Sequence, residues 1–398
     1  MVKLLFVHGT KFKQDDSGNL YTGGSYSSEI WKRYLIHTSR LTVLARTESK
    51  IYSSVEAKKN FNLFNHNEIS FKSLPDIRSS FKSFYSKKNR ENIEELIKNE
   101  VKNSDYIIIR LPCNYGNIAV KYAKKYNKPY LLEVVGCSWD ALWHYNWKGK
   151  VLAPISFMKQ RRSIINSSHV IYVTSSFLQS RYPTEGRSIN CSNVSIPSVS
   201  SEVLENRIVK ITSSFNGNKR LKIGTIGSLD AAYKGQDIVI KALSYLKSVG
   251  IRNYEYHLVG SGEGKRLKKL VKELGLEDQV FFKGTLPHQK INEWLDNIDL
   301  YIQPSKTEGL PRGLIEAMHR GLCALGTNVG GIPELLDSSF LLSTKKENYK
   351  EISTILKNIE INDLIEQGEK NFWKSESYSK ELINERRYKF IKEFISNE

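Results

Sequence analysis

The chain has 398 residues, of which 40% are hydrophobic and 26% are charged. These proportions are typical of a soluble globular protein, and at roughly 100–200 residues per domain the length predicts two or three domains. The same figures exclude a disordered chain, a collagen-like chain and a disulfide scaffold.

Net positive charge is concentrated in the first half of the chain, because that half has fewer acidic residues. Residues 1–200 hold 30 basic and 15 acidic residues, whereas residues 201–398 hold 30 and 27, within a formal net charge of +18. Such an imbalance favours an anionic partner. Nucleic acid, an anionic membrane surface and a phosphorylated substrate all fit this charge, as does solubility by simple repulsion.

The four cysteines are scattered along the chain without a C-x-x-C pair. This spacing predicts neither a zinc site nor a disulfide framework, and free thiols favour a cytoplasmic location. The apolar start of the chain is too short for a signal peptide, and no stretch approaches about 18 apolar residues. We therefore expect no transmembrane helix, so any contact with the inner face of the cytoplasmic membrane would be peripheral.

In the first half, short apolar runs alternate with stretches of helical periodicity. The strands predicted there are 4–7, 41–44, 106–111, 130–135 and 170–173. One helix is predicted to begin near Ser28 and a second to cover 91–101, and a third follows the strand 106–111 and runs through Val120 and Tyr126. A long polar loop is expected after the first strand, and residues 51–90 have too weak a periodicity to assign.

The second half repeats this alternation after a polar stretch rich in Ser and Asn at 199–219, which predicts a turn-rich linker. The strands predicted after it are 221–226, 256–259, 280–282, 300–302 and 323–325. The helices predicted there are 236–249, 264–274 and one that begins near Arg312. Residues 381–394 predict a charged amphipathic helix that packs back across the first domain.

Continuous apolar strands that alternate with helices indicate parallel sheets covered on both faces. The predicted fold class is therefore α/β, with two doubly wound, Rossmann-like domains. We expect domains at 1–198 and 220–375, a linker at 199–219 and a returning C-terminal helix at 376–398. Ligands bind at the carboxyl ends of such strands, so a ligand is expected in a cleft between the two domains.

The segment 304–318 is the richest in candidate chemistry. It follows a predicted strand, and it places Glu308 just before a helix and Glu316 inside it. A helix N-terminus binds anions, and carboxylates accept hydrogen bonds from sugar hydroxyls. The spacing alone also fits a structural alternative, in which Glu308 interacts favourably with the helix dipole and Glu316 is a solvated residue on the helix surface.

Other candidates lie in loops that follow predicted strands. Lys234 could add a positive charge to a phosphate site or be an ordinary surface lysine. Gly260 opens a glycine-rich turn that is weak evidence for a phosphate loop. Gly23 and Gly24 could permit close approach to a phosphate or form an ordinary turn.

The eight histidines form no metal-binding pattern, so no metal is expected. Asp140 and His144 follow the strand predicted at 130–135 and could line the cleft. His144 could as well be a packed or surface histidine.

Taken together, these residues resemble the family-4 retaining glycosyltransferases. The resemblance is strongest over 220–340, where the landmarks occur in the family's order and spacing. These landmarks are Lys234-Gly235, 260–262, Pro304-Ser305, Glu308 with Glu316, and 330–334. The resemblance implies a GT-B fold and transfer of a hexose-type sugar from a UDP- or GDP-linked donor, with no cofactor. It further implies a glycan or lipid-linked oligosaccharide acceptor in the biosynthesis of a bacterial surface polysaccharide, such as O-antigen or capsule.

The resemblance also implies roles for four residues of the 304–318 segment and for Lys234. Glu308 would contact the transferred sugar, and Glu316 would bind the ribose hydroxyls. Backbone N–H groups of Gly309 and Leu310 would reach the phosphate and the sugar. Lys234 would bind the diphosphate, which leaves with retention of anomeric configuration and without a metal ion.

Further donor contacts are implied around this segment. Thr285 and Leu286 would lie by the base, and Gly24, next to Gly23, would meet the diphosphate from the first domain. Gly260 would belong to the same donor site.

Two departures from the family pattern affect this prediction. The family usually has an Arg where this chain has Ser228, so one cation at the phosphate is missing unless Arg312 replaces it. The family also often has a His just after the fourth strand of the first domain. Here Asp140 or His144 would have to serve in its place.

Three other functions compete with this prediction. A basic nucleic-acid-binding protein would fit the charge, but no RNP, helix-turn-helix or zinc pattern is present. A nicotinamide oxidoreductase would fit two Rossmann-like domains, but the G-x-G-x-x-G spacing is absent after the first strand. An inactive sugar-nucleotide-binding scaffold would fit the two departures.

Overall fold

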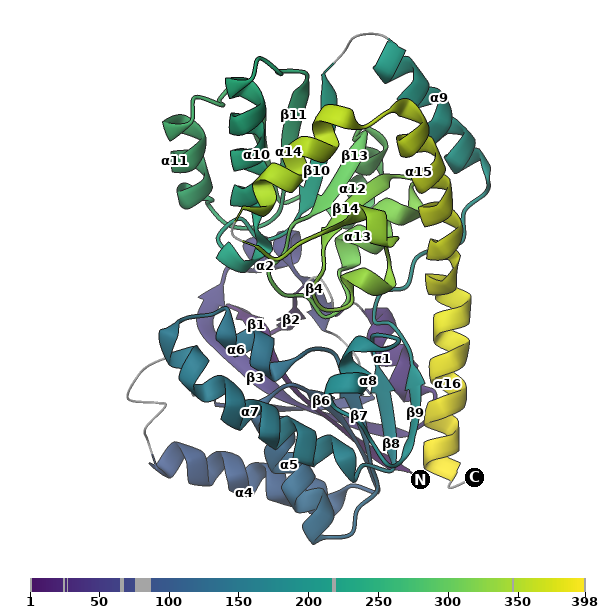
Figure 1. Cartoon of the computed structure of the whole chain (residues 1–398). Coiled ribbons are helices and arrows are strands. Elements are labelled where there is room, and N and C mark those ends of the chain that lie inside the picture. The colour runs from purple at the N-terminus through teal and green to yellow at the C-terminus, as the bar shows by residue number, and fades with distance from the viewer. Residues whose placement is uncertain are drawn as a thin grey trace.

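The chain folds into two α/β domains, with the second domain above the first in Figure 1. The computed structural model describes residues 2–23, 26, 28–64, 68–75, 87–216, 220–345 and 347–396. The C-terminal helix runs from the second domain down along the first (Figure 1). The predicted fold class, two Rossmann-like domains with a returning helix, is confirmed.

The first domain is built on a mostly parallel sheet. Among the described residues nine strands form it, in the order β4-β2-β1-β6-β7-β8-β9, with β3 paired to β1 and β5 to β3. The strands are β1 (Lys3–Asp15), β2 (Leu20–Thr22), β3 (Arg40–Tyr52), β4 (Asn62–Phe64), β5 (Ile69–Leu74), β6 (Tyr106–Leu111), β7 (Tyr130–Val134), β8 (His169–Tyr172) and β9 (Arg187–Asn190). Its central strands β6 and β7 are largely buried, and they are apolar except for Arg110 and Glu133, which pair with each other. This fits a sheet covered on both faces.

The start of this domain differs from the prediction. β1 extends past Val7 to Asp15, and β2 pairs with its far end in antiparallel fashion, with Lys13 opposite Tyr21. The expected long polar loop is therefore largely a hairpin. Polar residues alternate with the buried Phe12 in this extension, so the continuous apolar signal of a central strand is absent there.

The helices of the first domain cover both faces of its sheet. They are α1 (Ser28–Leu35), α2 (Ser54–Asn60), α4 (Lys87–Asn103), α5 (Asn114–Lys125), α6 (Ser138–Trp143), α7 (Trp147–Ile165) and α8 (Phe177–Arg181). One buried cluster joins α4 and α5 to the sheet through Ile97 and Ala119. A second cluster, on the opposite face, contains Trp31 of α1.

The second domain has an all-parallel sheet. Its described strands are ordered β12-β11-β10-β13-β14-β15. They are β10 (Leu221–Ile226), β11 (Tyr254–Val259), β12 (Val280–Gly284), β13 (Leu300–Gln303), β14 (Cys323–Thr327) and β15 (Leu341–Leu342). The order reverses between β10 and β13, and loops at the carboxyl ends of strands beside such a reversal form the usual ligand crevice.

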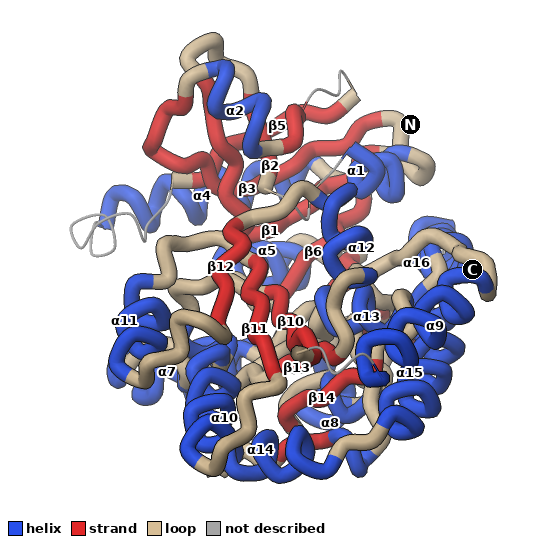
Figure 2. Tube along the Cα trace, turned by 90° about the horizontal axis from the view of Figure 1, so that it is seen from above, coloured by secondary structure: helices blue, strands red, loops and turns tan. Residues whose placement is uncertain are grey.

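Helices lie on both sides of this second sheet (Figure 2). The remaining helices and short 3-10 turns are α9 (Glu202–Asn216), η1 (Ala232–Lys234), α10 (Gln236–Ser248), α11 (Lys265–Glu273), α12 (His288–Asp296), α13 (Arg312–His319), η2 (Ile332–Glu334), η3 (Ser338–Phe340), α14 (Asn348–Asn358), α15 (Ile361–Ser375), η4 (Glu376–Tyr378) and α16 (Lys380–Ser396). The last of them, α16, packs on the first domain. α10 and α11 pack on one face of the sheet, whereas α12 and α13 pack on the other.

The turn-rich linker predicted at 199–219 is wrong as local structure, because its centre is the helix α9. Leu204, Arg207 and Ile211 are buried, at the spacing of one helical face. Arg207 donates to the backbone carbonyl groups of Leu295 and Ile298. α9 therefore packs on the second domain.

The chain crosses between the domains at two adjacent places. The Ile196 N–H donates to the Tyr378 carbonyl at 3.0 Å, and the Lys380 N–H donates to the Ile196 carbonyl at 2.8 Å. Beyond this point α16 buries Ile383, Phe390 and other apolar side chains in the first-domain core.

Candidate active site

The Glu308 carboxylate is held by three side chains at the carboxyl edge of the second sheet. Lys234 Nζ lies 2.6 Å from Glu308 Oε1. Ser305 Oγ donates to the same oxygen at 2.7 Å, and Gln303 Nε2 donates to it at 3.1 Å. Glu308 Oε2 has no hydrogen-bond partner among the described residues, so one carboxylate oxygen is fixed and the other is available.

The backbone around Lys234 is shaped by Gly235. Gly235 has φ +72°, and a Cβ atom there would lie 1.9 Å from the Pro304 carbonyl oxygen. Only glycine fits both the left-handed conformation and this close approach. The buried Gln236 then donates to the Ser228 carbonyl at 3.1 Å. These contacts seat the loop that carries Lys234 directly against the segment that carries Glu308.

Two buried residues of β13, Tyr301 and Gln303, were not predicted as part of the site, and they hold Glu308 through a chain of hydrogen bonds. The Tyr301 hydroxyl accepts the Ile226 N–H at 3.2 Å and donates to Gln303 Oε1 at 3.0 Å. Burial is the main reason that the pKa of Tyr301 is raised, and the charges of Glu316 and Glu308 act in the same direction. Tyr301 is therefore a common neighbour of both glutamates. A lone Tyr and Gln in an apolar strand give no sequence signal for this role.

Glu316 lies on α13 and is 8% exposed. Its burial raises the pKa of this carboxyl to about 7, although the charge of Arg312, one turn earlier, opposes the shift. α13 passes close to Tyr301, because a Cβ atom on Gly313 would lie 2.6 Å from the Tyr301 hydroxyl oxygen. The buried position excludes the alternative in which Glu316 is an ordinary solvated helix residue.

The residues after Glu308 form part of the contact between the domains. A Cβ atom on Gly309 would lie 2.6 Å from the Val135 carbonyl oxygen, at the carboxyl end of β7. Leu310 packs against buried clusters of both domains. The Gly331 N–H donates to the Gly309 carbonyl at 2.8 Å. Lys234, Glu308 and Glu316 therefore lie beside the interdomain face, and the second domain reaches the first through Gly309 and Leu310.

Glu334, in the 330–334 motif, forms a direct polar link to the first domain. Its carboxylate accepts the N–H groups of Ser176 and Phe177, where α8 begins, at 3.0 and 2.7 Å. The sequence pattern marks the motif but predicts no role for Glu334, because its partners are more than 150 residues away in the chain.

Asp140 and His144 lie in an interdomain cavity of about 660 Å³, which Lys306 of the second domain also lines. Burial lowers the pKa of His144, and the charge of Lys306 acts in the same direction whereas that of Asp140 opposes it. Asp140 is paired with Arg181 at 3.0 Å. The structure thus places both residues in the cleft, but no described hydrogen bond joins either of them to Glu308.

Among the glycines, Gly260 has a structural explanation. A Cβ atom on Gly260 would lie 1.9 Å from the Gly227 carbonyl oxygen, so two loops meet there backbone to backbone. The Gly23 carbonyl accepts the Tyr26 N–H at 2.9 Å, as in a turn. Gly24 lies outside the described residues.

Thr285 and Leu286, the predicted contacts to the base, lie in the loop after β12, whose last residue is hydrogen-bonded to Gly260. Gly284 accepts the Gly260 N–H at 2.9 Å, and Thr285 and Leu286 follow it. Thr285 is exposed, whereas Leu286 lines a cavity of about 360 Å³ beside α12. No described hydrogen bond joins either residue to the Lys234–Glu308 pair. The Ser228 carbonyl accepts hydrogen bonds from the Ala231 N–H at 3.4 Å and from Gln236 at 3.1 Å, whereas its hydroxyl group has no hydrogen-bond partner among the described residues.

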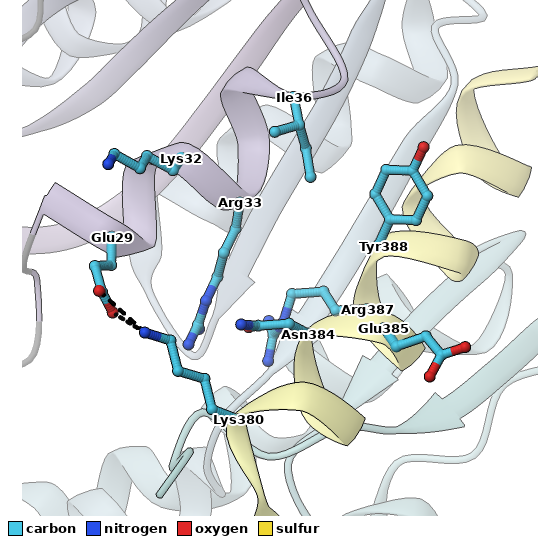
Figure 3. A pocket seen from close by; sticks show the side chains of 9 residues that line it. All are labelled: Glu29, Lys32, Arg33, Ile36, Lys380, Asn384, Glu385, Arg387 and Tyr388. Atoms are coloured by element: carbon cyan, nitrogen blue, oxygen red, sulfur yellow. Dashed lines mark hydrogen bonds and ion pairs between the residues drawn. The ribbon is translucent and has the colours of Figure 1, made fainter. Parts of the chain in front are cut away.

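A different cavity, of about 420 Å³, lies between α1 and α16 and is lined by residues of mixed charge (Figure 3). Glu29 and Lys380 form an ion pair across its mouth at 3.0 Å. Arg387 is buried at its base and is paired with Glu133 at 3.1 Å. None of the site residues predicted from the sequence lines this cavity.

Comparison with known proteins identifies several relatives by sequence. The family model described as "Glycosyl transferases group 1" matches residues 209–371. Protein CapJ of Staphylococcus aureus is 35% identical over 350 residues, which cover 86% of this chain and 83% of CapJ. The putative colanic acid biosynthesis glycosyltransferase WcaL of Escherichia coli is 35% identical over 112 residues, which cover 26% of this chain and 27% of WcaL.

Solved structures match over the whole chain. Sucrose-phosphate synthase from Thermosynechococcus elongatus superposes with a TM-score of 0.69 and 14% identity, covering 100% of both chains. The Anabaena protein Alr3699/HepE, in complex with UDP-glucose, superposes with a TM-score of 0.63 and 15% identity, covering 98% of this chain and 99% of that chain. At such low identity the likeness concerns the fold, which is GT-B.

Proposed function

We propose that this chain, which belongs to the glycosyl transferases group 1 family, moves a hexose-type sugar from a nucleotide sugar to a glycan or lipid-linked acceptor. The anomeric configuration would be retained, and the donor would be linked to UDP or GDP. The observation that carries this proposal is the Lys234–Glu308 pair at 2.6 Å, which lies beside the contact between the domains. There, at the edge of a Rossmann-like sheet, the Lys234 cation lies beside the Glu308 carboxylate, which can accept hydrogen bonds from sugar hydroxyl groups.

The relatives support a role in bacterial polysaccharide biosynthesis. WcaL is named for colanic acid biosynthesis, and colanic acid is a polysaccharide. The Anabaena neighbour was solved with UDP-glucose, which fits a nucleotide sugar as donor. These likenesses favour a sugar-nucleotide substrate over nucleic acid for the basic first domain.

The difficult step is the departure of the nucleoside diphosphate from the anomeric carbon. Negative charge grows on the diphosphate as the C–O bond breaks, so fixed positive potential nearby lowers the barrier. Lys234 supplies a full charge and uses one of its three N–H donors on Glu308, which leaves two for phosphate oxygens. The first N–H groups of α13 add partial positive charge on the same side.

Glu308 would orient the sugar without attacking it. Its Oε1 already accepts from Lys234, Ser305 and Gln303, which fixes the carboxylate and leaves Oε2 for a sugar hydroxyl. The acceptor hydroxyl would then attack from the face that the diphosphate leaves. The new C–O bond forms as the old one breaks, and the acceptor proton passes to a departing phosphate oxygen.

A donor screen on the purified protein tests the proposal. Release of nucleoside diphosphate is measured over a panel of UDP- and GDP-sugars, first with the wild type and then with Lys234→Ala and Glu308→Gln. Loss of one such contact should reduce turnover by about 10²–10³-fold. Lys272→Ala and Glu273→Gln, on the exposed face of α11, are matched controls. Near-normal turnover in both site variants would refute the assignment.

The second candidate function is an inactive sugar-nucleotide-binding scaffold. Ser228, in place of the usual Arg, and the absence of the expected cleft His favour it. Such a scaffold would bind a nucleotide sugar in calorimetry but release no nucleoside diphosphate with any acceptor. Transfer or hydrolysis of any donor in the panel excludes it.

The protein is also proposed to work at the inner face of the cytoplasmic membrane, as a peripheral protein. A lipid-linked acceptor would be located there, and the basic first half of the chain would favour an anionic surface.

A further inference from the structure

Helix α7 exposes large apolar side chains to solvent, although Phe157 and Ile164 of the same helix pack on the first-domain core. Trp147, Val151, Ile155 and Met158 are 71%, 66%, 53% and 46% exposed. Their spacing of three or four residues places them on one stripe of the helix. The buried face contains Gly149, Ala153, Gln160, Ser163 and Ile164. A surface helix of a globular protein normally has the reverse arrangement, with its large apolar residues inward.

Apolar exposure is concentrated at this place on the molecule. Seven of the eighteen exposed large hydrophobic side chains in the described part of the chain lie between residues 143 and 158. Trp143 and Tyr145, just before α7, are among them, at 39% and 77% exposure. Exposed apolar groups gathered in this way mark an interaction surface. Trp and Tyr favour the boundary between water and lipid, because each has an apolar ring with a polar group.

The same segment contains only positive charge. No acidic residue occurs between Asp140 and Glu185, where the chain has six basic residues. They are Lys148, Lys150, Lys159, Arg161, Arg162 and Arg181. At 3.6 residues per turn, Lys148 and Lys159 border one edge of the apolar stripe, and Lys150 and Arg161 border the other. An apolar stripe bordered by cations is typical of a helix that lies in the headgroup layer of an anionic membrane.

This surface lies next to the cavity between the two domains. α6 and α7 follow the carboxyl end of β7, and His144, between them, lines the interdomain cavity together with Lys306. Figure 1 shows α7 across the front of the first domain. No helix in the described ranges is both long and apolar enough to cross a bilayer, so contact through this surface would be interfacial.

We propose that the α7 surface, defined as Trp143, Tyr145, Trp147, Val151, Ile155 and Met158 with their flanking cations, docks the protein onto anionic lipid. This deepens the proposed function, because a lipid-linked acceptor would then be delivered beside the cleft. A second copy of the chain fits the surface poorly. A symmetric pair would bring two sets of these cations together without a carboxylate in the segment to compensate them.

Vesicle flotation tests the proposal directly. The wild type should float with vesicles that contain phosphatidylglycerol, should bind phosphatidylcholine vesicles more weakly, and should lose binding as salt is raised. Val151→Ser with Ile155→Ser should weaken partitioning by about tenfold or more, because both side chains would be buried in the interface. Lys159→Gln with Arg161→Gln should weaken binding only to the anionic vesicles.

Matched controls keep the outcome specific. Val209→Ser with Val249→Ser removes apolar side chains that are similarly exposed elsewhere (69% and 51%). Lys272→Gln with Lys357→Gln removes two exposed positive charges far along the chain from α7. Both control variants should float with the vesicles as the wild type does. Donor turnover without vesicles should be unchanged in all these variants, so failure of docking and failure of the proposed activity are distinguishable. Unchanged flotation of both α7 variants would overturn the proposal. A dimer in light scattering that Val151→Ser with Ile155→Ser dissociates would overturn it in favour of self-association.

Discussion

Glu334 of the second domain and Phe177 of the first are joined by a hydrogen bond, in which the Phe177 N–H donates to Glu334 Oε1 at 2.7 Å. The same carboxylate accepts the N–H groups of Ser175 and Ser176. Several N–H donors thus converge on one charge, a stronger arrangement than hydrogen bonds between neutral groups. Glu334 lies in the same short segment as Gly331, whose N–H donates a hydrogen bond to the Gly309 carbonyl. The link therefore holds the segment after the proposed catalytic pair against the first domain.

Glu334→Ala is expected to reduce kcat/KM for transfer by about tenfold, since charge-assisted hydrogen bonds contribute about 1.5–3 kcal/mol when shielded and less near solvent. Its melting temperature should stay close to that of the wild type, because the residue lies between the domains and outside both cores. Small-angle scattering should show a more open average arrangement. Glu366→Ala, on the exposed side of α15, is the control. Unchanged kinetics together with unchanged scattering would contradict a positioning role for Glu334.

Transfer is expected to persist in excess chelator. The proposed mechanism stabilises the departing diphosphate with the Lys234 charge and the first N–H groups of α13, so it requires no divalent cation. Product formation is measured after dialysis against EDTA, with and without added Mg²⁺. Complete loss of activity that Mg²⁺ restores would contradict the metal-independent step and leave the donor assignment standing.

The fold was predictable mainly where strands are buried on both faces. β10 has the predicted bounds, because its apolar residues, most of them buried, lie between polar, turn-rich stretches. α9 was missed because Ser and Asn dominate both its flanks, and they outweighed the helical spacing of Leu204, Arg207 and Ile211 between them. The β1–β2 hairpin was missed because its pairing partners carry mixed polar and apolar residues.

The site was predictable only through residues that form a compact motif. Lys234, Glu308 and Glu316 were predicted as site residues from the order of landmarks along the chain, and the structure brings Lys234 and Glu308 together. Gln303 and Tyr301 were not, because their role depends on hydrogen bonds between residues that only the folded sheet brings together. Which residue near Asp140 and His144 would contact the sugar stays a prediction.

The donor KM is expected to depend on the ionisation of Glu316. Burial raises the pKa of this carboxyl to about 7, so it is largely protonated below that pH and charged above it. The charged form accepts hydrogen bonds from both ribose hydroxyls, whereas the protonated form uses one oxygen as a donor. The KM should therefore fall as the pH rises from about 6 to about 8. Glu316→Gln should have a higher KM without this step, and an identical pH profile in both proteins would refute the ribose contact.

The buried Glu133 of β7 should make the first domain sensitive to acid. Burial alone would raise the pKa of this carboxyl, but the charges of Arg110 and Arg387, with hydrogen bonds from Arg110 and Tyr34, lower it to about 2. The depressed pKa means that Glu133 stabilises the folded state fully above its unfolded value of 4.5. That stabilisation is lost as the pH falls from about 5 towards 2, because the folded state must then bind a proton that the unfolded state already holds.

Glu133→Gln should therefore lower the melting temperature most at neutral pH, and the difference from the wild type should narrow as the pH falls to about 3. Removing one partner of a buried ion pair typically costs about 3–5 kcal/mol. If this variant does not fold, Tyr34→Phe removes the 2.9 Å hydrogen bond to Glu133, together with the 3.3 Å bond that the same hydroxyl accepts from Arg110, and should show the same trend on a smaller scale. α16 should loosen with Glu133→Gln, since Arg387 anchors it to β7, and amide hydrogen exchange in α16 measures this. A melting difference that stays constant across the pH range would contradict the coupling.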